Sequence, residues 1–255
     1  MNNYTFREMM TIAAAREIMD GDIVFCGTGI SMLAAMAAKH ISAPHSVIFF
    51  ETGAIDSLLE EVPLAVGDSR VMFWTSVNGG LADSFATMQN RFTGKHVVGI
   101  LGAAQIDKYG NLNSTAIGDY FRPDVRFSGS GGACDVASFV NRTIIFMQQE
   151  ERKFVNKLDY LTSPGYLDGP DGRKKAGLPE GGPSAVITNM AVMHFDEKTK
   201  EMYLKGYYPG ITPQEVLDNM QFKVDISRAE EMSAPSEEEL GILRERCDPQ
   251  RLILG

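Results

Sequence analysis

One glutamate stands out as a possible nucleophile. Glu51 follows four consecutive apolar residues, 47–50, and precedes Thr52 and Gly53. An apolar run that ends in a glycine turn predicts a buried strand, so Glu51 is expected at the carboxyl end of that strand, where open α/β sheets bind ligands. A carboxylate in such a place is costly to bury unless a reaction or a partner uses it. Glu51 is therefore a candidate for covalent chemistry, and a solvated strand-end acid is the alternative.

A bend rich in glycine is the second candidate for a chemical role. Gly129, Gly131 and Gly132 crowd one turn, and a helical pattern follows them. Backbone N–H groups in such a turn can point together at an anion, and the helix start adds positive potential. Acyl transfer requires donors of this kind at its oxyanion. A plain flexible turn is the other interpretation.

Gln105 is the third candidate. It is expected to end a strand, and Gly110 with Asn111 predicts a turn between two short segments that follow. The Gln105 amide could position a ligand or serve only a structural purpose.

Another glycine loop supports a rival hypothesis. Gly27-Thr28-Gly29 lies between a predicted strand and a predicted helix, and Glu51 follows at about the spacing of the acid that binds ribose in dinucleotide folds. However, Met32 occupies the third glycine position of that fingerprint and would hinder close packing of helix on strand. A nicotinamide dehydrogenase therefore stays open as an alternative.

Other chemistries have no support in the sequence. The four histidines are scattered, without the spacing of metal ligands, so no metal site is predicted. There is also no G-x-S-x-G elbow of a serine hydrolase and no phosphate-binding P-loop.

An alternation of apolar strands and helices must position these candidates. Thr5 and Glu8 predict a capping box at the start of a first helix, which is expected to run until Gly21. Strands are predicted within residues 22–29, 46–53, 97–107 and 143–150, and helices within 30–40 and 81–92. This order predicts an α/β fold with an open, mostly parallel sheet flanked by helices.

The C-terminal third has a different character. Residues 184–208 predict a β-hairpin on a charged turn, and two helices should follow, with capping boxes at Thr212 to Glu215 and at Ser236 to Glu239. Residues 161–184 form the longest predicted loop, dense in glycine and proline. We expect residues 1–255 to form a single domain.

Composition excludes several partners. The formal net charge is −9 at pH 7, which argues against non-specific binding to nucleic acid or to an anionic membrane. No apolar run of about 18 residues predicts a transmembrane helix, and the N-terminus does not read as a signal peptide. The three cysteines form no C-x-x-C pair, so reduced thiols in a cytoplasmic protein are expected.

Long stretches of the sequence resemble a known family. They cover nearly the whole chain and run, in order, through CGTGI, ETG, EVPLAVGD, GAAQIDKYGNLNSTAIGDY, RFSGSGGACDVAS, KLDYLTSPGYLDGP and FDEKTKEMYLKGYYPG. These motifs resemble the β subunits of the class I CoA-transferases, and among them most of all the B subunits of glutaconate CoA-transferases. The family fold is an open α/β sheet of the CoA-transferase/NagB-like type.

The resemblance implies an enzyme with a covalent mechanism. It maps the nucleophilic glutamate onto Glu51 and the oxyanion loop onto Gly131, Gly132 and Ala133. It further implies an active site shared with an α subunit, coenzyme A as a substrate and no permanently bound cofactor. The expected reaction moves CoA from an acyl-CoA donor to a carboxylic acid such as glutaconate through a glutamyl-CoA thioester.

Two departures leave alternatives open. Many relatives read E-N-G, whereas Thr52 stands here in place of the asparagine. Some relatives have lost the glutamate and act differently on CoA esters, and this chain keeps it. An acyl-CoA hydrolase of the same fold is the runner-up, and a non-catalytic scaffold protein is a third possibility.

Overall fold

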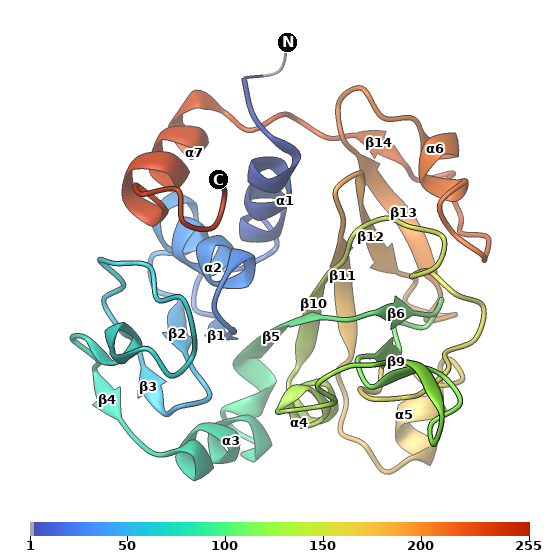
Figure 1. Cartoon of the computed structure of the whole chain (residues 1–255), viewed down its shortest axis with the longest axis horizontal. Helices are drawn as coiled ribbons and strands as arrows, with labels where there is room; N and C mark the ends of the chain where they lie inside the picture. The colour runs from blue at the N-terminus through green and yellow to red at the C-terminus, as the bar shows by residue number, and fades with distance from the viewer. Residues whose placement is uncertain (1–2) are drawn as a thin grey trace. The chain divides into compact units, whose positions relative to one another are not determined.

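The computed structural model describes residues 3–255, which form two compact units (Figure 1). Unit 1 contains the N-terminal part of the chain up to Leu101 together with Ala234–Gly255, and unit 2 spans Gly102–Ser233. The expectation of a single domain over 1–255 stays a prediction, because two compact units can still unfold together.

Unit 1 is built on a mixed sheet. Its strand order is β5-β1-β2-β3-β4, with β1 parallel to both β5 and β2 and with β3 and β4 antiparallel at the edge. The strands are β1 (Ile23–Phe25), β2 (Val47–Phe49), β3 (Ala54–Ile55), β4 (Val77–Asn78) and β5 (Val97–Gly102). The parallel strands are largely apolar and buried, as covered parallel strands should be.

Helices flank the sheet of unit 1. They are α1 (Phe6–Ala15), α2 (Ile30–Ile41), α3 (Leu81–Gln89) and α7 (Glu237–Ile242), with 3₁₀ turns at Ser69–Met72 and Gly94–His96 and a π turn at Leu243–Cys247. The alanine-rich α2 is buried between neighbours and packs on both α1 and α7 (Figure 1).

The first helix is shorter than the sequence predicts. The capping box of Thr5 and Glu8 is confirmed, but α1 ends at Ala15 rather than near Gly21. The next amides, of Glu17 and Ile18, donate to carbonyls only three residues back. Such bonds tighten the chain into 3₁₀ turns and end the α-helix.

Unit 2 also contains a mixed sheet. Its strand order is β14-β13-β12-β11-β10, with β10 and β11 parallel and β11, β12 and β13 antiparallel. The strands are β10 (Arg142–Phe146), β11 (Pro183–Ile187), β12 (Ala191–Phe195), β13 (Met202–Tyr207) and β14 (Glu230–Glu231). Two small hairpins pair β6 (Gln105–Ile106) with β7 (Leu112–Asn113), and β8 (Ala116–Gly118) with β9 (Pro123–Arg126).

Most predicted elements are confirmed, and so is the open α/β class. The hairpin predicted within 184–208 is only partly right: its first arm is two antiparallel strands, β11 and β12, and the hairpin on the charged turn is β12 with β13. Both predicted capping boxes begin helices, namely α6 (Pro213–Leu217) and α7. The strand expected within 97–107 is two strands, β5 and β6. The long loop carries a short helix, α5 (Gly172–Lys175), and α4 (Ala133–Phe139) follows the glycine bend as predicted.

Candidate active site

Glu51 lies at the tip of a tight turn between β2 and β3. The Phe50 amide donates to the Ala54 carbonyl, and the Gly53 amide donates back to the Phe50 carbonyl, each at 3.0 Å. Glu51 and Thr52 are therefore the two central residues of the turn. Phe50 itself is fully buried, so the turn is anchored at the core while its tip faces outward.

Only glycine fits at the close of this turn. Gly53 has a φ of 96°, and a Cβ there would lie 2.3 Å from the Gly79 carbonyl oxygen. The Gly79 amide donates to the Gly53 carbonyl at 2.9 Å, and the Ser84 hydroxyl donates to the Phe50 carbonyl at 2.9 Å. The start of α3 therefore lies directly against the Glu51 turn. This close approach of two backbone segments requires glycine at position 53, two residues after Glu51.

The Glu51 side chain is half-buried, and its carboxylate has no partner in the described part of the chain. Within residues 3–255, its carboxylate makes no hydrogen bond and no ion pair. Partly buried carboxylates normally acquire such partners, since desolvation is otherwise uncompensated. Glu51 thus has the free oxygen atoms that a nucleophile requires.

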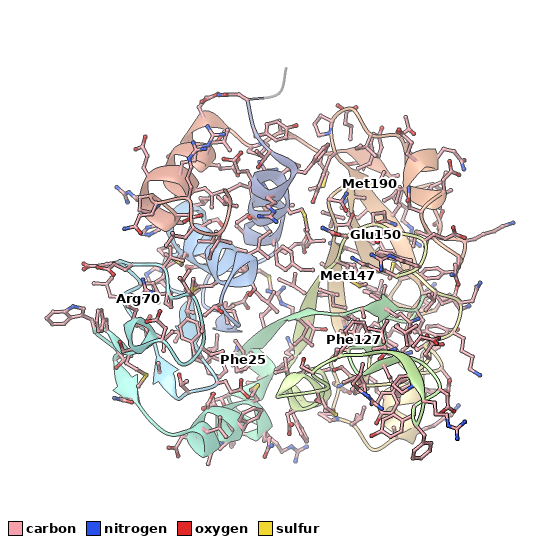
Figure 2. All side chains as sticks on the ribbon, in the orientation of Figure 1. Phe25, Arg70, Phe127, Met147, Glu150 and Met190 are labelled. Carbon is pink, nitrogen blue, oxygen red and sulfur yellow. The ribbon has the colours of Figure 1, made fainter. Side chains whose placement is uncertain are left out.

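The first glycine loop ends the neighbouring strand. Phe25 of β1, labelled in Figure 2, pairs in register with Phe49 of β2, so Gly27-Thr28-Gly29 and Glu51 follow the carboxyl ends of adjacent parallel strands. Met32 is completely buried in α2, which supports the sequence argument against a dinucleotide fingerprint. Burial raises the pKa of the Cys26 thiol to about 12, so this thiol stays protonated and does not compete as a nucleophile.

The second glycine bend is clamped at its start. The Gly129 amide donates to the Ser114 carbonyl at 3.1 Å, and the Ser114 hydroxyl donates to the Gly129 carbonyl at 3.0 Å. Gly129 and Gly131 both have positive φ, of 91° and 49°. Glycine adopts these angles without a steric penalty, which explains the residue pattern of the bend.

The amides of the bend are not equivalent. The Ala133 amide donates to the Ser130 carbonyl at 2.9 Å, and the Cys134 amide donates to the Ser130 hydroxyl at 3.0 Å. The amides of Gly131 and Gly132 make no hydrogen bond within residues 3–255. Of the three residues expected to form an oxyanion hole, two present unused donors and Ala133 does not.

Gln105 belongs to an internal network. Its side chain is 5% exposed, its Nε2 donates to Asp159 Oδ2 at 2.8 Å, and its Oε1 accepts from Asn113 Nδ2 at 2.7 Å and from the Asp159 amide at 3.1 Å. Most of its hydrogen-bonding capacity is therefore used inside the protein. Of its two interpretations, a structural amide agrees better with this geometry than a ligand contact.

Arg173 is a site-supporting residue that the sequence does not reveal. It is buried, and it donates to the Ala137 and Ser138 carbonyls of α4 at 3.0 and 2.8 Å and to Gly165 at 3.1 Å. Burial lowers the pKa of the guanidinium, which the nearby Tyr166 partly offsets. A cation on the last carbonyls of α4 fixes the helix that begins at the glycine bend. Its place in a long loop gave no signal of this role.

A pocket of about 550 Å³ adjoins the bend in unit 2. Its lining combines five apolar residues with one amide side chain, two serines and two cationic side chains. The lining residues are Ala103, Ala104, Gln105, Ser114, Ile117, Val125, Phe127 (labelled in Figure 2), Ser128, Arg152 and Lys153.

The structure brings some of the predicted residues together within a unit. Gln105, Asn113, Ser114 and Gly129 are joined in unit 2 by hydrogen bonds and adjacent backbone, so Gln105 and the bend share one framework. Glu51 and its turn are built entirely in unit 1.

Neither a metal cluster nor a membrane-spanning helix occurs in the described part of the chain. Among residues 3–255 there is no group of three or more His, Cys, Asp or Glu side chains that could hold a metal ion. No helix in the same range has the length and apolarity to cross a membrane.

Comparison with known proteins identifies the family. A model of the family "Coenzyme A transferase" matches residues 7–219. The chain is 45% identical to the B subunit of glutaconate CoA-transferase from Acidaminococcus fermentans, over 99% of this chain and 96% of that protein. It is 37% identical to the B subunit of 3-oxoadipate CoA-transferase from Pseudomonas knackmussii, over 96% and 94% of the two chains.

A solved structure agrees with these relatives. The crystal structure of glutaconate coenzyme A-transferase from A. fermentans has a TM-score of 0.96 to this chain at 43% identity, covering 99% of this chain and 98% of that one. The resemblance read from the motifs is thereby confirmed, and with it the prediction of a CoA-transferase. This protein belongs to the coenzyme A transferase family.

Proposed function

We propose that this chain is the catalytic component of a heteromeric CoA-transferase that works on short carboxylic acids of the glutaconate or 3-oxoadipate kind. One observation carries the proposal: the Glu51 carboxylate has no partner within residues 3–255 at the tip of a glycine-closed turn. Likeness to the B subunits of two such enzymes, over nearly the full chain, supports the substrate class.

Glu51 begins the reaction as the nucleophile. Its carboxylate oxygen attacks the thioester carbonyl of the donor, the C–S bond breaks, and CoA leaves as the thiolate. A mixed anhydride between Glu51 and the acyl group results. The thiolate then attacks the Glu51 carbonyl carbon, the C–O bond of the anhydride breaks, and the donor acid is released.

The second half runs these steps in reverse with a new acid. The acceptor carboxylate attacks the Glu51-CoA thioester and displaces the thiolate, which then attacks the acceptor acyl carbon and frees Glu51. One thioester replaces another, so no external energy source is needed. Covalent catalysis divides one difficult exchange into easier steps.

The bend at Gly131 and Gly132 is proposed to stabilise the oxyanions. Among residues 3–255 no group accepts a hydrogen bond from these two amides, whereas the Ala133 amide donates to the Ser130 carbonyl. The proposed oxyanion hole therefore has two donors. One donor of this type is typically worth about 3–4 kcal/mol of transition-state stabilisation. The clamp by Ser114 and the anchoring of α4 by Arg173 would hold the bend in a fixed geometry.

An α subunit is proposed to complete the site. Glu51 is only half-buried in this chain, yet its anhydride and thioester would hydrolyse if water reached them freely. A second polypeptide that covers the turn would exclude water and contribute the pocket for the acid. We further propose that CoA enters as a substrate, that no cofactor stays bound and that the enzyme works in the cytoplasm.

Assays of Glu51 variants test this function. The assembled complex should transfer CoA from acetyl-CoA to glutaconate, and Glu51→Ala should reduce kcat/KM by at least about 10³-fold. Glu51→Asp should retain little activity, because the shorter side chain moves the oxygen atoms back toward the turn. Full activity of the Ala variant would refute the proposal.

An assay without an acceptor acid distinguishes transfer from hydrolysis. With buffer in place of the acceptor acid, a transferase should stop after forming its enzyme intermediate. Continued turnover would instead assign the acyl-CoA hydrolase alternative.

A further inference from the structure

The long loop of unit 2 forms a cavity that the proposed mechanism does not use. The cavity measures about 630 Å³ and lies among residues 166–181, which include α5 (Figure 1). One wall comes from Lys200, in the charged turn between β12 and β13. Loops of this length inside a compact unit are often functional, so the cavity is a candidate binding site.

The charged side chains that line the cavity are mostly cationic. Arg173, Lys174 and Lys200 face Asp171 and Glu180, and the other lining residues are uncharged. A surplus of positive charge is unexpected on a chain whose formal net charge is −9. A local positive field attracts anions even when the whole protein repels them. The cavity therefore favours an anionic ligand.

The two lysines have unused hydrogen-bond donors. Within residues 3–255, the ammonium groups of Lys174 and Lys200 make no hydrogen bond and no ion pair. Lys200 Nζ lies 5.1 Å from the centroid of the Tyr166 ring, and the Tyr166 hydroxyl donates to the Pro183 carbonyl at 2.9 Å. The cation–π contact thus positions Lys200 without using the donors of its ammonium group.

The backbone adds donors to this wall. Glu180 and Gly181 line the cavity, and no group among residues 3–255 accepts a hydrogen bond from their amides. Gly181 has a φ of 130°, and a Cβ there would lie 2.6 Å from the Asn141 carbonyl oxygen, so only glycine fits. Successive amides of a glycine turn can bind an anion together.

The arginine of the cavity is already engaged. Arg173 donates to four carbonyls, those of Pro179, Ala137, Gly165 and Ser138. It therefore offers no parallel pair of free donors, which is the arrangement that best recognises a planar carboxylate. Lysine ammonium groups with backbone amides are instead a common set of donors for phosphate. The available donors favour phosphate over a carboxylate.

We infer that this cavity binds a phosphate group, held by Lys174, Lys200 and the amides of Glu180 and Gly181. The inference goes beyond the proposed function and does not depend on Glu51. Free inorganic phosphate and the phosphates of coenzyme A are two sources of the same chemical group, and the experiment distinguishes them.

The affinity for phosphate tests the inference. By calorimetry in a low-salt buffer, the full chain is titrated with inorganic phosphate and the assembled complex with CoA. We expect Lys174→Gln and Lys200→Gln each to weaken the binding of at least one of these ligands by at least about fivefold. Lys175→Gln and Lys198→Gln are matched controls, since each removes one exposed charge from the same segments but outside the cavity lining. Both controls should bind as the wild type does.

Titration with 3′-dephospho-CoA identifies the source of the phosphate. If the cavity takes the 3′-phosphate of CoA, Lys174→Gln and Lys200→Gln should lose affinity for CoA but not for 3′-dephospho-CoA. A loss for both molecules assigns the diphosphate, and a loss for inorganic phosphate alone assigns free phosphate. Each of these results supports the site. If neither lysine variant changes the affinity for CoA or for phosphate, any phosphate that binds is an adventitious ion only, and the inference is overturned.

The phosphate site and the proposed chemistry can fail separately. Glu51→Ala should bind inorganic phosphate as the wild type does while losing transfer. If transfer does not depend on Glu51 but the two lysine variants lose affinity for phosphate, the phosphate site stands and the mechanism falls.

Discussion

Two polar side chains predicted for the site have opposite surroundings. Gln105 of unit 2 is buried, and Asp159 and Asn113 engage both ends of its amide. Glu51 of unit 1 is half-buried and makes no hydrogen bond or ion pair within residues 3–255. A side chain whose hydrogen-bonding groups are all used inside the protein stabilises the framework, whereas a carboxylate without such bonds at a strand end is available for chemistry.

The same contrast appears between two acids of unit 1. Glu8 closes the capping box of α1, and Arg244 Nε donates to Glu8 Oε1 at 2.6 Å. The ionised carboxylate of Glu8 is therefore stabilised by an ion pair. Glu51 has the same carboxylate without these partners. Charged groups that lack partners inside the protein occur mainly at functional sites. Glu8 is therefore a structural acid, and Glu51 fits a functional one.

Replacement of Glu51 should separate activity from stability most strongly. Glu51→Gln keeps the size of the side chain but removes the nucleophile, so kcat/KM of the assembled complex should fall by at least about 10³-fold. The free energy of unfolding should change by less than about 0.5 kcal/mol, because the Glu51 carboxylate makes no hydrogen bond or ion pair within residues 3–255. Steady-state transfer assays and urea unfolding measure the two quantities. Glu238→Gln, at an exposed acid of unit 1, is the control and should affect neither. A large loss of stability in Glu51→Gln would mean that the Glu51 carboxylate stabilises the folded chain and is not reserved for chemistry.

Replacement of Gln105 should show the reverse pattern. Gln105→Ala removes three hydrogen bonds and leaves a small cavity, so it should destabilise the protein by about 2–3 kcal/mol. Urea unfolding measures the change, with Gln89→Ala at an exposed position as the control. If Gln105→Ala kept full stability but raised KM severalfold, the amide would be a ligand contact after all.

The paired acid should show a dependence on pH. Burial alone would raise the pKa of Glu8, but the hydrogen bonds from Arg244 and the Thr5 amide and the charge of Arg244 hold it below its ordinary value of 4.5. Because the folded-state pKa lies below the unfolded one, this stabilisation is present above about pH 4.5 and is lost as pH falls. Glu8→Gln should therefore cost about 1 kcal/mol at pH 7 and less near pH 3. A cost that is the same at both pH values would contradict the assigned pairing.

Relief of the strain at Trp74 should give the smallest effect. Glycine adopts a φ of 51° freely, so Trp74→Gly removes a steric penalty while discarding a mostly exposed side chain. We expect the isolated chain to gain about 0.5 kcal/mol in its free energy of unfolding, or to stay within that range of the wild type. Denaturant unfolding of the isolated chain measures it. A loss above about 1 kcal/mol would mean that the indole stabilises this chain itself.

Local signals in the sequence located much of the fold and the Glu51 turn. Capping boxes, apolar runs and glycine turns involve neighbouring residues, so Thr5, Glu51 and Gly131 could be placed without a structure. The partners of Gln105 could not, because Asp159 lies 54 residues away and no local pattern joins the two. Arg173 and Trp74 gave no signal either, since burial of a loop arginine and a positive φ at tryptophan both depend on tertiary contacts.

The most direct test of the mechanism is to trap the intermediate. The assembled complex is incubated with acyl-CoA without an acceptor and reduced with borohydride, and its peptides are sequenced by mass spectrometry. Reduction of the glutamyl thioester should convert residue 51, and no other acidic residue, to the corresponding alcohol. An unmodified Glu51 in a complex that still transfers CoA would contradict the mechanism proposed for this enzyme.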